Sequence, residues 1–476
     1  MNARSLSAED AAILYAQAPG TQLQIGALCF FEAAPLRDGR GRLRHEALRS
    51  HIDARLGPLP RFRQRIAPVL ADLAAPMWVD DTDFDIERHH KLVQLPGEGG
   101  ADALREFVDR LLGEPMDVAH PLWDIHFIEG VDNMTSGDVA DVEAIAVVVR
   151  AHHVMADGIA LHAAATLLLD AIPRRHRSEP HDWCPEPTPG TLSLTARALA
   201  ERTRRQAGLA VDVTRALIDP RRIASNARLA SQVVGSIHHR VPAAAPKLPF
   251  TKPTGQRRAF AWDSIPMADI VAVKQSCGVT VNDVVLAIAT GALRRQLEDT
   301  GSFDPAGREP RALIPIGSHE STASALRNRF SITSVALPVG VDDPLERVRL
   351  IHSRMHGHET SPARSFMPHL FSIADLVPPV LLRALVPRLL AHQPLVNLAV
   401  SNIPGSRAPL FLWESRMLGL HPFISVVGNV TLIIGVLSHA DDLGVGITVD
   451  PDVVGDPRAI AARVRAAATE LVALVR

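Results

Sequence analysis

Ala151-His152-His153-Val154-Met155-Ala156-Asp157-Gly158 is the stretch from which the rest of the chain is best interpreted. Residues 142–150, directly before it, are almost wholly apolar and rich in β-branched side chains, which is typical of a strand buried on both faces. Residues 159–169, directly after it, are good helix formers. Asp157 is then the expected N-cap of the helix, and Gly158 permits a tight turn. The sequence therefore predicts two histidines where a core strand leads into a helix.

The histidines of this stretch have the chemistry of a general base. An imidazole held at the end of a rigid strand and facing a cleft can accept a proton near neutral pH. Two other interpretations stay open. The chain has 21 histidines, so the stretch could be purely structural. His153, Asp157 and His162 also have a spacing compatible with metal binding, although no fourth ligand or cysteine cluster is nearby.

The composition limits the class of protein. With 476 residues, of which 47% are hydrophobic, the chain can form two domains or one unusually large one. The net charge of −2 provides no basic field, so we expect no nucleic-acid partner. Cys29, Cys184 and Cys277 are far apart and odd in number, which fits a reducing cytoplasm. No uninterrupted apolar run reaches the ~18–20 residues that a membrane-spanning helix needs.

Proline-rich stretches divide the chain. Four prolines fall within residues 180–189, and residues 242–253 are rich in proline and alanine. We therefore expect an N-terminal domain over 1–175, a crossover linker with a long helix over 176–255, and a C-terminal domain over 256–476. Strands and helices are interspersed in both halves, and at least one strand pair is predicted to be an antiparallel hairpin. This pattern predicts an α/β or α+β fold with mixed sheets.

Four motifs carry a resemblance to a known family. His-His-x-x-x-Asp-Gly at 152–158 resembles the active-site motif of the CoA-dependent acyltransferase superfamily. Within it, the chain is similar to the bacterial bifunctional wax ester synthase/diacylglycerol acyltransferases (WS/DGAT), and the similarity covers nearly its whole length. The other motifs are Pro121-Leu122-Trp123, Val281-Asn282-Asp283 and Ser401-Asn402-Ile403-Pro404-Gly405. Ser406 stands where the family often has a second proline.

The resemblance implies an α/β fold of two chloramphenicol-acetyltransferase-like domains, with a tunnel between them and the His motif at its middle. In that arrangement His153, the second histidine, is the general base, while His152 supports the backbone or the tunnel wall. Asp157 is expected to fix the loop rather than to handle protons. The remaining candidates are Asn282 for the developing oxyanion, with bracing of a neighbouring loop as an equal alternative, and Gly158 and Asn402 for substrate binding.

The implied activity is an O-acyltransferase that moves a long-chain acyl group from acyl-CoA to diacylglycerol, giving triacylglycerol, or to a long-chain alcohol, giving a wax ester. Acyl-CoA is a substrate, and neither a cofactor nor a metal is expected. Three alternatives stay open. A peptide-synthetase condensation domain is not expected to share the other three motifs. An acyltransferase for a small polar acceptor is a closer competitor. A non-catalytic lipid-binding or lipid-droplet protein of the same fold would have no need of the intact base.

Residues 376–398 are strongly apolar, but they also contain Pro378, Pro379, Pro387 and Pro394, with Arg383 and Arg388 between them. The prolines and arginines argue against a membrane-spanning helix. They favour a bent helical pair that covers the core or lies on lipid. We therefore expect a cytoplasmic protein that associates peripherally with the inner face of the membrane or with lipid droplets.

Overall fold

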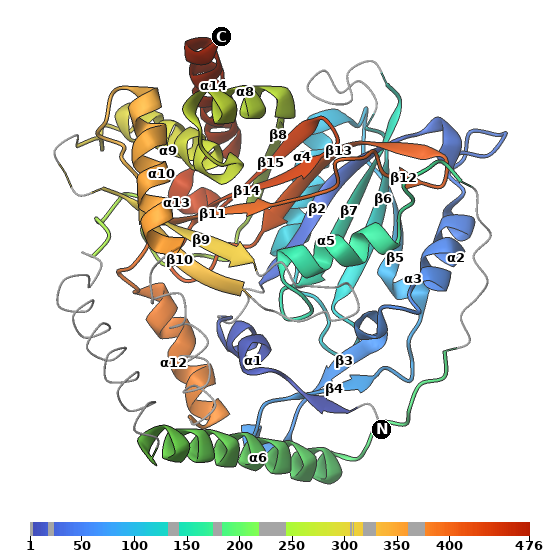
Figure 1. The fold of residues 1–476 in the computed structure, drawn as a ribbon. Helices are drawn as coiled ribbons and strands as arrows, with labels where there is room; N and C mark the ends of the chain where they lie inside the picture. The colour runs from blue at the N-terminus through green and yellow to red at the C-terminus, as the bar shows by residue number, and fades with distance from the viewer. Residues whose placement is uncertain are drawn as a thin grey trace.

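Two six-stranded sheets form the body of the molecule (Figure 1). Each contains both parallel and antiparallel neighbours. The mixed α/β class expected from the sequence is therefore confirmed. The computed structural model describes residues 3–17, 23–131, 142–174, 183–218, 244–304, 307, 309–317, 330–359 and 377–476.

The first sheet leads into the histidine motif and has the strand order β12-β13-β2-β7-β6-β5. The strand before the histidines, β7, is buried along almost its whole length, as predicted. Because side chains alternate along a strand, Val147 and Ala151 join one hydrophobic core, whereas Ala146 and Val148 join another. The strands are β2 (Gln24–Glu32), β5 (His90–Gln94), β6 (Trp123–Glu129), β7 (Ala144–His152), β12 (Phe411–Leu412) and β13 (Ser415–Ile424).

The second sheet has the strand order β10-β9-β11-β14-β15-β8. The predicted hairpin is confirmed, with β14 antiparallel to β15, whereas β11 runs parallel to both β9 and β14. The strands are β8 (Ala259–Pro266), β9 (Arg311–Gly317), β10 (Phe330–Ala336), β11 (Leu398–Ile403), β14 (Leu432–His439) and β15 (Asp442–Val449). The helices that pack around its large core are α8 (Met267–Cys277), α9 (Val281–Asp299), α10 (Pro344–Glu359) and α14 (Pro457–Val475).

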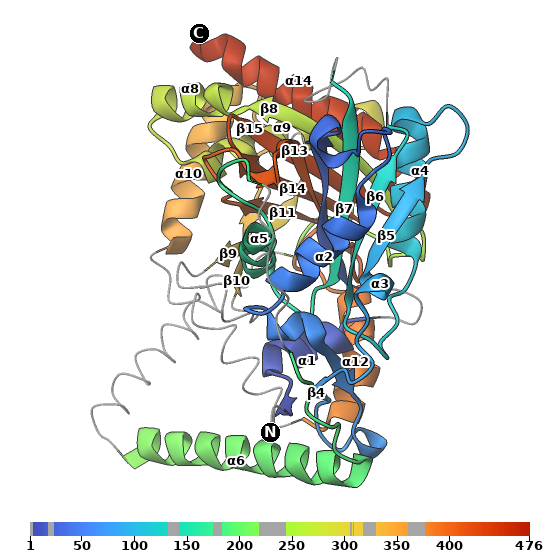
Figure 2. The same ribbon diagram turned by 90° about the vertical axis from the view of Figure 1, so that its right-hand side faces the viewer.

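The remaining elements lie outside these two sheets. Figure 2 shows α6, the long helix expected in the linker, at the bottom of the molecule, below α1 and β4. A small sheet has the order β1-β4-β3 (Arg4–Ser5, Met77–Asp80, Gln64–Ala67). The other helices are α1 (Ala8–Tyr15), α2 (His45–Arg55), α3 (Ile86–His89), α4 (Gly100–Gly113), α5 (Gly158–Leu167), α6 (Thr191–Ile218), α12 (Pro379–Ala391) and α13 (Pro451–Val454), with short turns η1 (Ala34–Leu36), η2 (Pro60–Arg63) and η3 (Leu70–Asp72).

The strand β13 joins the two halves of the chain. It comes from the second half, yet it pairs with β2 and so extends the first sheet. It also approaches β15 closely, because a Cβ atom on Gly446 would lie 1.7 Å from the carbonyl oxygen of Pro422. Only glycine permits that approach of two backbones. The domain boundaries at 175 and 256 stay a prediction, because residues 175–182 and 219–243 lie outside the described residues. The two sheets do not follow these boundaries, since β13 belongs to the first sheet.

The apolar stretch near residue 376 forms one helix, α12, in the described part of the chain, so the expectation of a bent pair is not met there. Pro378 and Pro379 stand at its N-cap and first turn, where a missing N–H is tolerated, and Pro387 lies inside it. Leu376 itself is outside the described residues. Among those residues no single helix has the length and apolarity to cross a membrane, although the bent pair α8 and α9, at 103°, passes by length and composition.

Candidate active site

A cavity of about 720 Å³ lies between the two sheets. Its wall combines strands of the first sheet with α5, α12 and β11, and it is overwhelmingly apolar. Cys29 also lines it, but burial raises the pKa of this thiol to about 12, which keeps it protonated and unreactive. The few other side chains with polar atoms in the wall are His153, Asp157, His162, Thr166, Ser401, Asn402 and Ser425.

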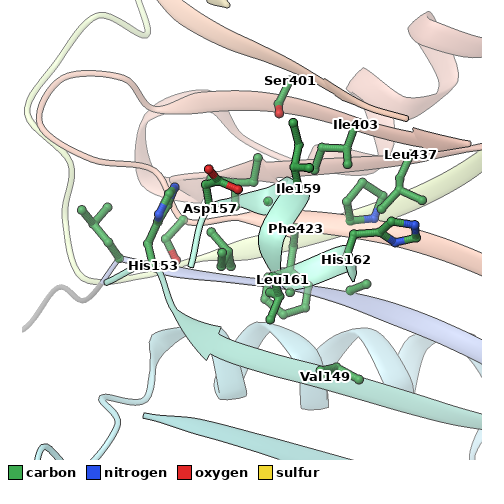
Figure 3. Close-up of a pocket in the computed structure, with 18 of the residues that line it drawn as sticks. Val149, His153, Asp157, Ile159, Leu161, His162, Ser401, Ile403, Phe423 and Leu437 are labelled. Atoms are coloured by element: carbon green, nitrogen blue, oxygen red, sulfur yellow. The ribbon is translucent and has the colours of Figure 1, made fainter. Parts of the chain in front are cut away.

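His153 follows directly after β7 and lines the cavity (Figure 3). Its backbone N–H donates to the carbonyl oxygen of Leu23 at 2.7 Å, so the sheet hydrogen bonding continues up to this residue. The structure therefore places the predicted base at the end of a rigid strand, with a largely apolar space in front of it.

His152 is held away from the cavity. It is buried, and its Nδ1 accepts a hydrogen bond from the Val154 N–H at 3.0 Å. Its Nε2 lies 2.6 Å from the side-chain amide nitrogen of Gln17. Burial, followed by the neighbouring His153, lowers the pKa of His152 to about 3. His152 is thus a neutral residue that fastens the turn carrying His153.

Asp157 and Gly158 start α5. The Asp157 carboxylate accepts a hydrogen bond from the Ala160 N–H at 2.8 Å, which confirms the predicted N-cap. Asp157 also lines the cavity, although it is largely buried. A Cβ atom on Gly158 would lie 2.7 Å from Cδ1 of Ile403, so glycine lets the first turn of α5 approach β11. Both residues thus fix the place where the two halves of the cavity meet.

The predicted site residues from the second half are only partly brought together. Asn402 lines the cavity, whereas Asn282 is not among the lining residues in the described part of the chain. Asn282 lies in the first turn of α9, next to Asp283, which forms a capping box with Thr280. This placement gives no support to Asn282 as the oxyanion donor.

Ser401 is a cavity residue to which the sequence analysis assigned no role, although it begins one of the four motifs. It lies on β11 with its hydroxyl drawn in Figure 3, and Ala399 and Ile403 line the same cavity. Since side chains two apart share a face of a strand, this alternation could have identified Ser401 once the strand was assigned. His162 was considered only as a metal ligand. Within the described residues, no group of three His, Cys, Asp or Glu side chains is placed to hold a metal ion.

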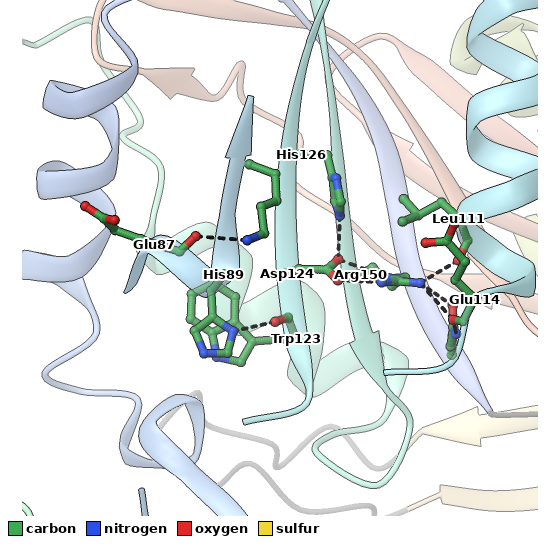
Figure 4. Close-up of polar contacts among 10 residues, drawn as sticks. Glu87, His89, Leu111, Glu114, Trp123, Asp124, His126 and Arg150 are labelled. Carbon is green, nitrogen blue, oxygen red and sulfur yellow. Dashed lines mark hydrogen bonds and ion pairs between the residues drawn. The ribbon is translucent and has the colours of Figure 1, made fainter. Parts of the chain in front are cut away.

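A buried ion pair supports the strands behind the site (Figure 4). Arg150 on β7 binds Asp124 on β6 through Nε and Nη2, and its Nη1 donates to the carbonyl oxygens of Leu111 and Glu114 at the end of α4. His126 contacts the same carboxylate at 3.1 Å. Burial alone would raise the pKa of Asp124, but hydrogen bonds from His126 and Arg150 outweigh it and hold that pKa below its ordinary value.

Trp123 of the Pro-Leu-Trp motif is a core residue. Its indole N–H donates to the carbonyl oxygen of Phe62 at 2.7 Å, and its ring stacks on His89 at 4.6 Å between centroids. It is buried and does not line the cavity in the described structure. The motif therefore contributes packing beside the histidine-bearing strand.

The sequence comparisons agree with this geometry. The family model of the wax ester synthase/diacylglycerol acyltransferase catalytic domain matches residues 6–285, and that of the WS/DGAT C-terminal domain matches residues 326–471. A probable diacylglycerol O-acyltransferase of Mycobacterium tuberculosis is 32% identical over 458 residues, which cover 95% of this chain and 92% of that relative.

Two solved structures share the fold. The wax ester synthase/diacylglycerol acyltransferase from Marinobacter aquaeolei VT8 superposes with a TM-score of 0.67 at 21% identity, covering 99% of each chain. The first condensation domain of the CDA synthetase superposes with a TM-score of 0.59 at 13% identity, covering 99% of this chain and 96% of that one. These likenesses show the two-domain, chloramphenicol-acetyltransferase-like architecture. The chain belongs to the wax ester synthase/diacylglycerol acyltransferase family and is an acyltransferase.

Proposed function

We propose that the protein transfers a long-chain acyl group from acyl-CoA to the hydroxyl group of diacylglycerol or of a long-chain alcohol, with His153 as the general base. The observation that carries the proposal is the position of His153, an imidazole at the wall of an otherwise apolar cavity. Such a cavity suits aliphatic chains, whereas a small polar acceptor would leave most of it unfilled.

The proposed reaction is a direct transfer. The imidazole of His153 removes the hydroxyl proton while the acceptor oxygen attacks the thioester carbonyl carbon. The tetrahedral intermediate then collapses, the C–S bond breaks, and the imidazolium returns the proton to the CoA thiolate. Acyl-CoA is the only co-substrate, and no cofactor takes part. Ser401 and Asn402, two cavity residues with hydrogen-bond donors, are the candidates for stabilising the oxyanion in place of Asn282.

The substrate class is testable by comparing acyl donors and acceptors. We expect palmitoyl-CoA with dioleoylglycerol to release free CoA much faster than acetyl-CoA with a small polar alcohol, because long chains bury apolar surface in the cavity. CoA release is followed with a thiol reagent, and the acylated product is identified by mass spectrometry. Faster turnover of acetyl-CoA with the small alcohol would reject the lipid substrates.

The same proposal includes peripheral attachment to a lipid surface. Helices α6 and α12 both contact the short turn η3, and all three elements expose large apolar side chains, of which Leu192 (76%) and Leu389 (67%) are the most exposed. The full set, named here the lipid-facing surface, is Leu70, Leu73, Leu192, Leu199, Val380, Leu381, Leu385 and Leu389. Leu389 also lines the cavity, together with other residues of α12 such as Leu382 and Val386. One helix thus lies between this surface and the site.

Charge favours an anionic lipid surface. Helix α12 carries Arg383 and Arg388 and no acidic residue, although Arg383 pairs with Asp72 of η3 at 2.8 Å. Helix α6 carries four arginines with one glutamate over residues 191–208. The chain as a whole has a net charge of −2, so the positive charge is local. Arginines around exposed leucines are typical of helices that lie in the headgroup region.

Vesicle binding tests the lipid-facing surface. Replacing Leu381 and Leu385 together by serine should weaken co-sedimentation with phosphatidylglycerol-containing vesicles by at least about tenfold, because each leucine contributes apolar burial. Leu474→Ser, at an exposed leucine on α14, is the matched control and should leave binding unchanged. Carbonate washing should release the unmodified protein from membranes. Retention until detergent is added, or unchanged binding by the double variant, would contradict peripheral attachment through this surface.

A further inference from the structure

His162 is a polar residue in the cavity wall that the proposed mechanism does not use. It lies on α5, four residues after Gly158 and four before Thr166, and all three residues line the cavity. Residues at this spacing share one face of a helix. Figure 3 shows His162 at the end of the cavity opposite to His153, close to Leu437 in this view.

The imidazole of His162 is available to a ligand. Within the described part of the chain its ring makes no hydrogen bond, in contrast to Thr166, whose hydroxyl already donates to the Ala163 carbonyl oxygen at 2.7 Å. Burial, followed by the nearby His439, lowers the pKa of His162. The ring is therefore neutral near pH 7 and presents one N–H donor and one nitrogen acceptor.

An unpaired polar ring in an apolar wall favours a ligand that supplies a hydrogen-bond partner. The two acceptor classes of the proposed function differ in this respect. A long-chain alcohol has a single oxygen atom, and in the proposed reaction this oxygen is hydrogen-bonded to His153. A diacylglycerol has the same free hydroxyl group and also two ester carbonyl groups, one on each of the other two glycerol carbons. His162 lies five positions after Asp157, the N-cap of α5, which corresponds to a rise of about 7.5 Å along the helix. A glycerol backbone with a hydrogen bond at each end is long enough to bridge such a distance.

We propose that His162 donates a hydrogen bond to an ester carbonyl of a glyceride acceptor while His153 activates its hydroxyl group, so that His162 selects diacylglycerol over a simple long-chain alcohol. This inference rests on the proposed function, since it assigns the acceptor of the same site. His162 is then a specificity-determining residue at the acceptor end of the cavity. A bound alcohol leaves the ring unpaired, whereas a diacylglycerol satisfies it.

Three acceptors isolate the contribution of the carbonyl group. They are dioleoylglycerol, its dialkyl ether analogue, which has the same free hydroxyl and chain length but lacks both carbonyls, and hexadecanol. With palmitoyl-CoA as donor, the unmodified protein should show a kcat/KM about tenfold higher for the diester than for the diether, the effect of one unsatisfied buried hydrogen-bonding group.

Variants then assign that preference to His162. His162→Leu should lower kcat/KM for dioleoylglycerol about tenfold and leave the diether and hexadecanol within about twofold, which removes the ester preference. His162→Gln keeps a donor and should retain part of it. Thr166→Val, on the same helix face, is the control and should keep the preference.

Two results would overturn the role of His162: an equal loss with all three acceptors in His162→Leu, or an ester preference that survives this substitution. These outcomes are separate from failure of the proposed function. If the unmodified protein released no CoA with any of the three acceptors, the acyl-transfer proposal itself would be rejected, together with the selectivity built on it.

Discussion

His153→Ala is expected to lower kcat by about 100-fold or more, the range for loss of a general base. Binding of acyl-CoA and of the acceptor should change little, because the cavity wall is formed almost entirely by apolar side chains that stay in place. The melting temperature should also stay close to that of the unmodified protein. The measurement is kcat and KM with palmitoyl-CoA and a saturating acceptor, together with the thermal unfolding curve. Near-normal turnover by His153→Ala would overturn the mechanism.

The neighbouring residues of the motif provide the controls for His153. Asp157→Asn preserves the size of the N-cap and much of its hydrogen bonding, so it should slow the reaction less than His153→Ala. Asp157→Ala should lower both the rate and the melting temperature, because the Ala160 N–H loses its acceptor. His152→Ala should give an intermediate rate with a clear loss of stability, since His152 is fully enclosed in the turn. A stable but inactive Asp157→Asn would instead make the aspartate a residue that orients the imidazole.

The sequence was sufficient to predict the histidine-bearing strand, the helix after it and the cap between them. These features depend on local composition and on one N-cap residue, Asp157, whose preferences act over a few residues. The apolar run before His152 could be assigned because β7 is packed on both faces, which leaves few polar positions in it.

The strand β13 could not be predicted in the same way. Gly419 and Pro422 interrupt its alternation, and the pairing with β2 shifts register between Met417 and Gly419. Proline normally argues against a central strand. In the described chain β12 pairs only with Ser415 and Arg416 of β13. At Pro422, therefore, β13 pairs with β2 on one side and has no strand of its own sheet on the other side. Tertiary contacts between the two halves, which a sequence pattern does not contain, determine this strand.

The candidate site shows the same division between local and long-range information. His153, Asp157 and Gly158 are neighbours in the chain, and the structure keeps them at one place in the cavity wall. Asn282 and Ser401 belong to distant segments, and motif similarity alone does not indicate which of them reaches the cavity. That depends on how β11 and α9 pack in the second half, a property of the fold rather than of either motif.

Arg150→Met is expected to destabilise the protein by about 3–5 kcal/mol, the usual effect of removing one partner of a buried ion pair. The substitution removes the guanidinium that pairs with the buried Asp124 carboxylate. Of the two side chains that contact this carboxylate, only His126 is then left. The substitution also removes the donor to the carbonyl oxygens of Leu111 and Glu114 at the end of α4. Arg416→Met, at an exposed arginine on β13, is the matched control and should change the melting temperature little.

The pH dependence of this effect follows from Asp124. In the folded protein its pKa is held below the ordinary value, so the pair contributes stability that is present above the unfolded pKa of about 3.9 and is lost as the pH falls through the folded pKa. Without the guanidinium, burial raises the pKa of Asp124, and the carboxyl group becomes neutral at a higher pH. The difference in melting temperature between the unmodified protein and Arg150→Met should therefore be large at pH 7 and shrink towards pH 4.

A second substitution distinguishes an unpaired charge from lost packing. If the buried carboxylate causes most of the destabilisation, Asp124→Leu combined with Arg150→Met should recover much of the melting temperature, because neither charge is then left in the core. If the double variant is instead as unstable as the sum of the two single variants, the stability lost with Arg150 comes from its hydrogen bonds to α4. His153 lies three residues beyond Arg150, so turnover measured at low temperature, where each variant is folded, should remain close to normal. A large loss of kcat in a folded Arg150→Met would show that the pair also positions the catalytic strand.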